Sequence, residues 1–183
     1  MSHSHLPTQP MVLDQAMPTW WQHEVHSIPL PPSHGDVMEA ADKLTWGEVP
    51  FFHGLLTALS LGLRRLPDDV RVLALFEHGG YAVIHRSPDE LLAAGLLRLS
   101  TRHYSMNLGD DPVVGFRRLA EPGVKVALNF LSRDGMLRTE TRVQPTTRAA
   151  KAVFLPYWAG VRVGGGLIRR SWLRGIRQRS ILQ

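Results

Sequence analysis

The sequence contains no cysteine, which excludes disulfide bonds, thiolate zinc sites and cysteine nucleophiles. It also contains no uncharged apolar run of about 18 residues, so it predicts no transmembrane helix. The opening stretch, MSHSHLPTQP, lacks the basic segment and the apolar segment of a secretory signal. We therefore expect a cytoplasmic protein.

Acidic residues are absent from the last part of the chain. All 16 Asp and Glu residues lie at or before Glu140, whereas nine of the 21 Lys and Arg residues follow it. This asymmetry indicates either an anionic partner, such as a membrane or nucleic acid, or the solvent side of a helix packed on an acidic body. The second interpretation is favoured, because most of these arginines fall on the outer side of a predicted helix.

Length and composition fit one globular domain. With 183 residues, of which 44% are apolar and 20% charged, the chain can bury a core without disulfides or metal. Residues 1–18 combine three prolines with scattered polar residues and show no hydrophobic period. They predict a flexible tail, followed by a single domain over residues 19–183.

The first part of this domain predicts a strand and two short helices. Trp20–Leu30 alternates between apolar and polar residues, as a half-buried strand does. Two amphipathic segments, Gly35–Leu44 and Val49–Leu63, then have the apolar spacing of helices. Tyr81–Arg86 is rich in residues that favour strands.

A strand–turn–strand followed by a long helix is the clearest local pattern. Val124–Ser132 and Met136–Val143 alternate as strands on either side of a glycine-containing turn. The helix is predicted from Thr147 to about Arg179. Pro156 and the triple glycine 164–166 are expected to bend or loosen it. At about 100° per residue its apolar stripe comprises Phe154, Trp158, Val161, Gly165, Ile168, Trp172 and Ile176.

The order of these elements resembles the helix-grip fold of the START, polyketide-cyclase and birch-pollen-allergen-like (SRPBCC) superfamily, uncharacterised bacterial members in particular. The resemblance is carried by PPSHGDVMEAADKLTWGEVPFFHGLLTAL, LAEPGVKVALNF, TETRVQPTTRAAKAVFLPYW and GLIRRSWLRGIRQ. It implies an α+β fold: a curved antiparallel sheet wrapped around a long C-terminal helix, with two short helices near the N-terminus. It also implies that Glu90–Ser100, whose composition favours a helix, forms a strand.

The resemblance implies a function as well, because members of this superfamily typically hold a hydrophobic molecule between sheet and helix. We expect non-catalytic binding or carriage of a small lipid- or polyketide-like ligand, without a cofactor or a metal. For the candidate residues on the helix, the alternative to ligand contact is ordinary packing in the core. Asn129 points either into the cavity or toward solvent. The candidate lining residues are Phe52, His53, Asn129, Thr139, Phe154, Tyr157, Trp158 and Val161.

Two other functions stay open. A cyclase- or aromatase-type enzyme needs two titratable groups inside the cavity, for which Glu140 and His53 are the candidates. A peripheral binder of anionic membranes would use basic residues of the helix, whose mixture with Trp and Leu suits a membrane better than nucleic acid. These basic residues are Arg162, Arg169, Arg170, Arg174 and Arg177. The oligomeric state and the ligand are left open.

Overall fold

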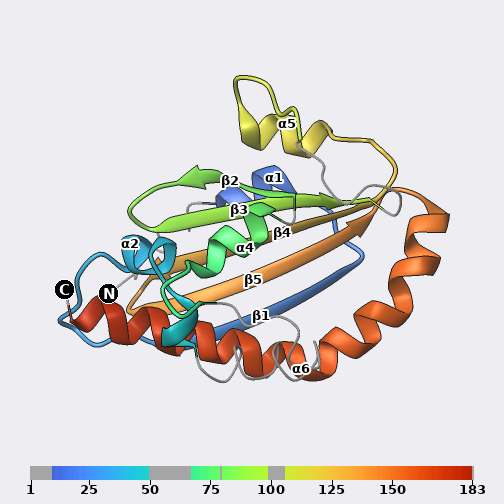
Figure 1. Ribbon diagram of the computed structural model, residues 1–183. Helices are drawn as coiled ribbons and strands as arrows, with labels where there is room; N and C mark the ends of the chain where they lie inside the picture. The colour runs from blue at the N-terminus through green and yellow to red at the C-terminus, as the bar shows by residue number, and fades with distance from the viewer. Residues whose placement is uncertain (1–9, 50–66, 79, 99–105, 183) are drawn as a thin grey trace, which may run out of the picture.

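The protein is an α+β fold built on one antiparallel sheet, seen in a computed structural model (Figure 1). The structure describes residues 10–49, 67–78, 80–98 and 106–182, without the side chains of residues 75, 76, 78 and 159–164. Its strands lie in the order β1-β5-β4-β3-β2, and all neighbouring pairs are antiparallel. The strands are β1 (Gln22–Pro29), β2 (Tyr81–Arg86), β3 (Glu90–Leu97), β4 (Val124–Arg133) and β5 (Met136–Pro145).

Helices cover both faces of this sheet (Figure 1). The face that carries α2 (Val37–Asp42), η1 (Trp46–Glu48), α4 (Val72–His78) and α6 (Arg148–Ile181) is called the inner face. The opposite, outer face carries α1 (Val12–Ala16) and α5 (Pro112–Arg118). Side chains alternate between the two faces along each strand, so neighbouring residues of β4 and β5 enter different environments.

Two separate apolar clusters fill the inner face. The first inner cluster packs α2 and the C-terminal half of α6 on the sheet, with Trp172 and Ile176 fully buried against Phe130 and Leu137. The second inner cluster lies under the N-terminal half of α6. It contains Val124, Val126, Val143, Ala150, Phe154 and Trp158. The predicted apolar stripe is therefore confirmed at Phe154, Trp158, Gly165, Trp172 and Ile176, which are all buried.

The outer face has its own core, and part of it comes from a segment that we expected to be a tail. Leu13 and Ala16 of α1 are fully buried, together with Phe116 of α5 and Leu92 of β3. The expectation of a flexible tail over residues 1–18 therefore does not hold for residues 12–16. These residues form a helix because of tertiary contacts: the sheet supplies the apolar surface that a single helical turn needs to be stable.

Local signals explain most element boundaries. The carboxylate of Asp36 accepts a hydrogen bond from the Glu39 amide at 2.8 Å at the start of α2, and Asp111 caps α5 in the same way. Between β4 and β5, Asp134 and Gly135 both have positive φ angles, as a two-residue hairpin turn requires. These caps and this turn fix where the chain enters and leaves the sheet.

The predicted strands at Trp20–Leu30, Val124–Ser132 and Met136–Val143 correspond to β1, β4 and β5. Within the predicted segment Glu90–Ser100, residues Glu90–Leu97 form strand β3, as the resemblance implied and against their helical composition. The predicted helix at Gly35–Leu44 is the shorter α2. The helix expected over Val49–Leu63 lies outside the described residues, except for Val49.

Helix α6 runs for 34 residues and changes direction partway along the sheet (Figure 1). Thr147 caps its start, and Pro156, which has no N–H to donate, lies inside it. Gly165 and Gly166 face β1 closely. A Cβ atom on Gly165 would lie 3.0 Å from Oε2 of Glu24, and one on Gly166 would lie 3.4 Å from Cε1 of His26. The glycines therefore let α6 pass close to two polar side chains of β1.

Candidate functional site

Each face of the sheet carries a group of buried or partly buried polar side chains, and the two groups differ in how well they are hydrogen-bonded. The outer network consists of Glu90, Asn129, Glu140 and Arg142, all buried on the outer face. The inner belt consists of Glu24, His26, Thr141 and Arg169, which lie between the two inner clusters. Buried polar groups are normally paired, so the difference separates structural roles from binding roles.

In the outer network, Asn129 joins two strands and α1. Its Nδ2 donates to Oε1 of Glu90 at 2.8 Å, and its Oδ1 accepts from the backbone amide of Glu140 at 3.0 Å. The Glu90 carboxylate also accepts from the backbone amides of Val12 at 2.7 Å and Leu13 at 3.2 Å. These two amides are free donors of the first turn of α1, so Glu90 caps that helix from another part of the chain.

Arg142 completes the outer network, and all three nitrogens of its guanidinium group donate hydrogen bonds. Nε donates to Oε1 of Glu140 at 2.7 Å, Nη2 to Oδ1 of Asp14 at 2.6 Å, and Nη1 to the carbonyl of Met17 at 2.8 Å. The ring of Trp20 stacks on it, 4.0 Å from Cζ. No buried side-chain atom of the four network residues lacks a partner within the described chain. The outer network therefore has the character of a structural site.

The charge of Glu140 is balanced by two neighbouring arginines. Burial disfavours the charged form of Glu140, but hydrogen bonds and charges from Arg142 and Arg138 outweigh it, so the pKa of Glu140 falls below its ordinary value. Glu140 is thus an ionised carboxylate between two arginines on the outer face. This position argues against the acid–base role considered for it, and His53 lies outside the described residues.

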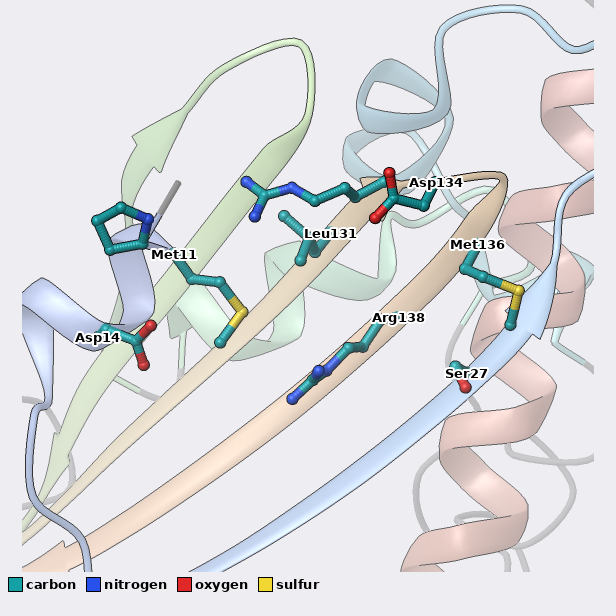
Figure 2. A pocket seen from close by; sticks show the side chains of 9 residues that line it. Met11, Asp14, Ser27, Leu131, Asp134, Met136 and Arg138 are labelled. Carbon is teal, nitrogen blue, oxygen red and sulfur yellow. The ribbon is translucent and has the colours of Figure 1, made fainter. Parts of the chain in front are cut away.

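An open pocket of about 540 Å³ lies beside the outer network, bordered by α1 and the β4–β5 hairpin (Figure 2). Three of its four charged lining residues form ion pairs: Asp14 binds Arg142, Arg138 binds Glu140, and Arg133 lies 3.7 Å from Asp89. Within the described chain, Nε of Arg138 is the one buried side-chain atom of these lining residues without a partner.

The inner belt is built from β1, β5 and α6. The β-sheet register places Glu24 opposite Thr141 and His26 opposite Thr139, and these side chains face α6. Arg169 follows Gly165 by one helical turn, which puts it on the same side of α6 as the contact with Glu24. The belt therefore brings one carboxylate, one imidazole, one hydroxyl and one guanidinium group into a layer between apolar walls.

Polar atoms on the inner face are incompletely paired. Within the described chain, Oγ1 of Thr141, Nε1 of Trp158 and Nη1 of Arg169 are buried and have no hydrogen-bond partner. Thr139, two residues from Thr141 on the same face, donates to the carbonyl of Asn129 at 2.7 Å. A buried polar group without a partner costs about 1–3 kcal/mol, which natural proteins accept mainly where a ligand or water satisfies it.

Burial shifts the pKa values of Arg169 and His26 in the belt and of the nearby Tyr81. It lowers the pKa of Arg169 to about 10, against the opposing effects of Glu24, Tyr81 and Tyr157. It lowers the pKa of His26, with Glu24 opposing and Arg169 assisting, and it raises the pKa of Tyr81. At neutral pH the belt therefore presents a cationic Arg169 beside a neutral His26 and a neutral Tyr81.

Several residues predicted from the sequence do lie on the inner face. Phe154 and Trp158 belong to the second inner cluster, and Thr139 is buried beside the belt. Tyr157 is on the same helix but 60% exposed. Asn129 lies on the outer face, so the sheet separates it from the other candidates. Phe52, His53 and the side chain of Val161 lie outside the described residues.

The basic residues proposed for membrane binding divide into two groups. Arg170 and Arg174 are exposed and Arg177 is partly exposed, as expected for the outer side of α6. Arg169 was grouped with them, but its buried Nη1 and its contact with Trp172 place it toward the sheet. The side chain of Arg162 is not described.

Sequence reasoning missed Glu24, His26, Thr141 and Tyr81, and it considered Arg169 only for a membrane or anion contact. A signal for most of them was present. Alternation in β1 puts Glu24 and His26 on one face, and Arg169 falls only about 20° beyond the edge of the apolar stripe at about 100° per residue. The glycines of the stripe marked where the helix and β1 come close.

Comparisons of this chain with family models, with curated proteins and with solved structures found no match. Within the described ranges, no group of three or more His, Asp or Glu side chains is arranged to hold a metal ion. No helix in the described part of the chain is both long enough and apolar enough to cross a membrane.

Proposed function

We propose that the protein binds or carries a small, largely hydrophobic molecule between its sheet and α6, in a fold of the helix-grip type. One observation carries the proposal: buried polar atoms without partners gather on the inner face, in and beside a belt between two apolar clusters. On the outer face the four network residues are fully paired, and within the described chain only Nε of Arg138, beside them, is buried without a partner.

The composition of this layer is typical of ligand sites. Such sites have mostly apolar walls and a few polar groups that orient the bound molecule. Here Trp158 and Phe154 supply apolar surface at one end and Trp172 at the other. Thr141 and Arg169 supply polar atoms between them. The helix-grip assignment is supported by the pairing of the first strand with the last and by the long C-terminal helix beside them.

Ligand binding can be tested without knowing the natural ligand. We expect native mass spectrometry of freshly purified protein to detect a bound small molecule, and Nile red, an uncharged apolar dye, to bind saturably to delipidated protein. Bound dye should also quench tryptophan fluorescence, because Trp158 and Trp172 flank the belt. Absence of both a co-purified molecule and saturable dye binding would remove the proposal.

Two threonines of β5 provide a matched pair of variants. Thr141→Val removes a buried hydroxyl that has no partner, so we expect the free energy of unfolding to rise by up to about 1 kcal/mol. Thr139→Val removes a hydroxyl that donates to Asn129, so we expect a loss of about 1–2 kcal/mol. Urea denaturation measures both. Equal effects of the two substitutions would contradict the distinction between a structural and a ligand-facing hydroxyl.

A second candidate function is contact with an anionic membrane surface, favoured by the outer side of α6. Val153, Leu155, Tyr157 and Leu167 are all more than half exposed there. Exposed basic residues, including Lys151, Arg170 and Arg174, lie on the same helix, and no acidic residue does. An amphipathic helix with apolar and basic residues binds anionic lipid surfaces.

We expect the protein to bind vesicles of phosphatidylglycerol but not of phosphatidylcholine, and binding to weaken as salt screens the charges. Replacing Leu155 and Tyr157 together by Ser should reduce this binding about tenfold or more, since about 2 kcal/mol of side-chain burial is lost. Leu182→Ser is the control, because Leu182 is exposed at the far end of α6. Vesicle co-sedimentation measures the effect. Equal binding to both lipids would reject an anionic membrane contact.

A further inference from the structure

Arg169 is the residue whose position calls for an explanation beyond general ligand binding. Its Nη1 atom is buried without a partner within the described chain, and its guanidinium lies 5.0 Å from the ring centroid of Trp172. Glu24 is the carboxylate that acts on it electrostatically, yet no salt bridge between the two is found among the described contacts. A buried guanidinium without a paired anion is costly, so Arg169 is suited to accept an anion from outside the chain.

The surroundings of Arg169 limit what such an anion can be. Glu24 lies against Gly165, one turn before Arg169, and opposite Thr141 in the sheet. A dianion such as a phosphate ester would bring two negative charges beside one buried cation and one carboxylate. A carboxylate matches the single charge of Arg169 and the geometry of two guanidinium N–H groups. The apolar clusters on both sides suit an uncharged hydrocarbon or aromatic body.

We propose that the molecule bound on the inner face is an organic acid, whose carboxylate pairs with Arg169 while its apolar body contacts the clusters beneath α6. This inference rests on the proposed function and names the class of its ligand. The hydroxyl of Thr141, which has no partner in the described chain, offers a further hydrogen bond to the ligand from the neighbouring strand.

Electrostatics in the belt support this assignment. Burial lowers the pKa of Arg169 to about 10, which still leaves the group cationic at neutral pH. The neutral state of His26 and Tyr81 leaves Arg169 as the cation of the belt. Glu24 opposes an acid by its like charge, so its removal should strengthen acid binding. Replacing Arg169 should therefore weaken the binding of an acid, whereas replacing Glu24 should strengthen it.

The test compares decanoate with decanol, which share a hydrocarbon chain and differ in charge. Displacement of Nile red from the full-length protein gives the affinity of each compound. We expect decanoate to bind roughly tenfold to hundredfold more tightly than decanol, the range of a charged hydrogen-bonded pair. Arg169→Met should remove the preference for decanoate, so that the two compounds bind with similar affinity, because the charge is lost while most of the apolar stem is kept.

Three further variants make the result specific. Arg174→Met removes an exposed charge from the same helix and should leave the preference for decanoate intact. Arg169→Lys keeps the charge but loses the paired N–H geometry, so it should give an intermediate preference, and it replaces Arg169→Met if that variant does not fold. Glu24→Gln should strengthen decanoate binding without changing decanol.

The outcomes separate this inference from the proposed function. Equal affinities for decanoate and decanol, or a preference that survives Arg169→Met, would overturn the organic acid and leave hydrophobic binding in place. Failure of decanoate to displace bound Nile red would also overturn it. If Nile red itself does not bind, the proposed function fails, and the inference fails with it.

Discussion

A chain that begins at Met17 is expected to lose most of its folded population, whereas a chain that begins at Met11 should retain nearly full stability. The shorter chain lacks α1, whose Leu13 and Ala16 are fully buried, and it deprives Glu90 of two amide donors. Burial of a leucine is worth about 1.5–3 kcal/mol and a hydrogen bond to a charged group about 1.5–3 kcal/mol. The expected loss of about 5 kcal/mol approaches the whole stability of a typical domain.

Urea denaturation of the two truncated chains and the full-length chain measures this loss. The chain that begins at Met11 is a matched control, because it keeps α1 and its hydrogen bonds to Glu90. Equal unfolding midpoints for all three chains would contradict a structural role for α1 and return residues 12–16 to the expected tail.

The hydrogen bonds of α1 explain why the sequence did not predict this helix. It is a five-residue helix, too short to show an amphipathic period, and the side chain of Met11 at its N-cap makes no capping hydrogen bond. The cap comes from Glu90, 78 residues away from Val12 in the sequence. Sequence patterns within one window cannot detect a helix whose cap and apolar partner both come from the sheet.

In strand β3 the local preference of the sequence conflicts with the tertiary structure. Its sequence, ELLAAGLL, has the composition of a helix, yet seven of its eight residues are buried. The strand is sandwiched between β2 and β4 and covered by helices on both faces, so alternation of polarity disappears and only an apolar run remains. The helix α6 and the β4–β5 hairpin were predictable because their caps, turn and periodicity are local.

The site was predictable in part. The apolar stripe of α6 and the inward position of Thr139 follow from periodicity alone. Which polar atoms find partners depends on contacts between distant elements, and periodicity does not give these. Thr139 and Thr141 share a strand, a face and near-complete burial, yet of these two hydroxyls only that of Thr139 has a partner among the described residues. That difference, which locates the belt, exists only in the folded structure.

The second large effect is expected for Arg142→Met, which should lower the free energy of unfolding by about 3–5 kcal/mol, as loss of one partner of a buried ion pair does. Arg142 has a 3% exposed side chain and bonds Glu140, Asp14 and the carbonyl of Met17. Arg138 is the matched control: it bonds the same carboxylate from the same strand but is 39% exposed. Arg138→Met should therefore cost about 1 kcal/mol or less.

Acid titration identifies the charge responsible. Arg142 and Arg138 hold the pKa of Glu140 below its ordinary value of 4.5, despite burial, so this carboxylate stabilises the fold above that pH. The stabilisation is lost as pH falls through the lowered pKa, because protonation removes the charge that Arg142 pairs with. The cost of Arg142→Met should consequently shrink in acid, and Glu140→Gln should recover part of it at neutral pH. Urea denaturation of the single and double variants across this range measures both effects. Failure of Glu140→Gln to recover any of the cost at neutral pH would show that Arg142 acts through its other bonds, to Asp14 and the carbonyl of Met17.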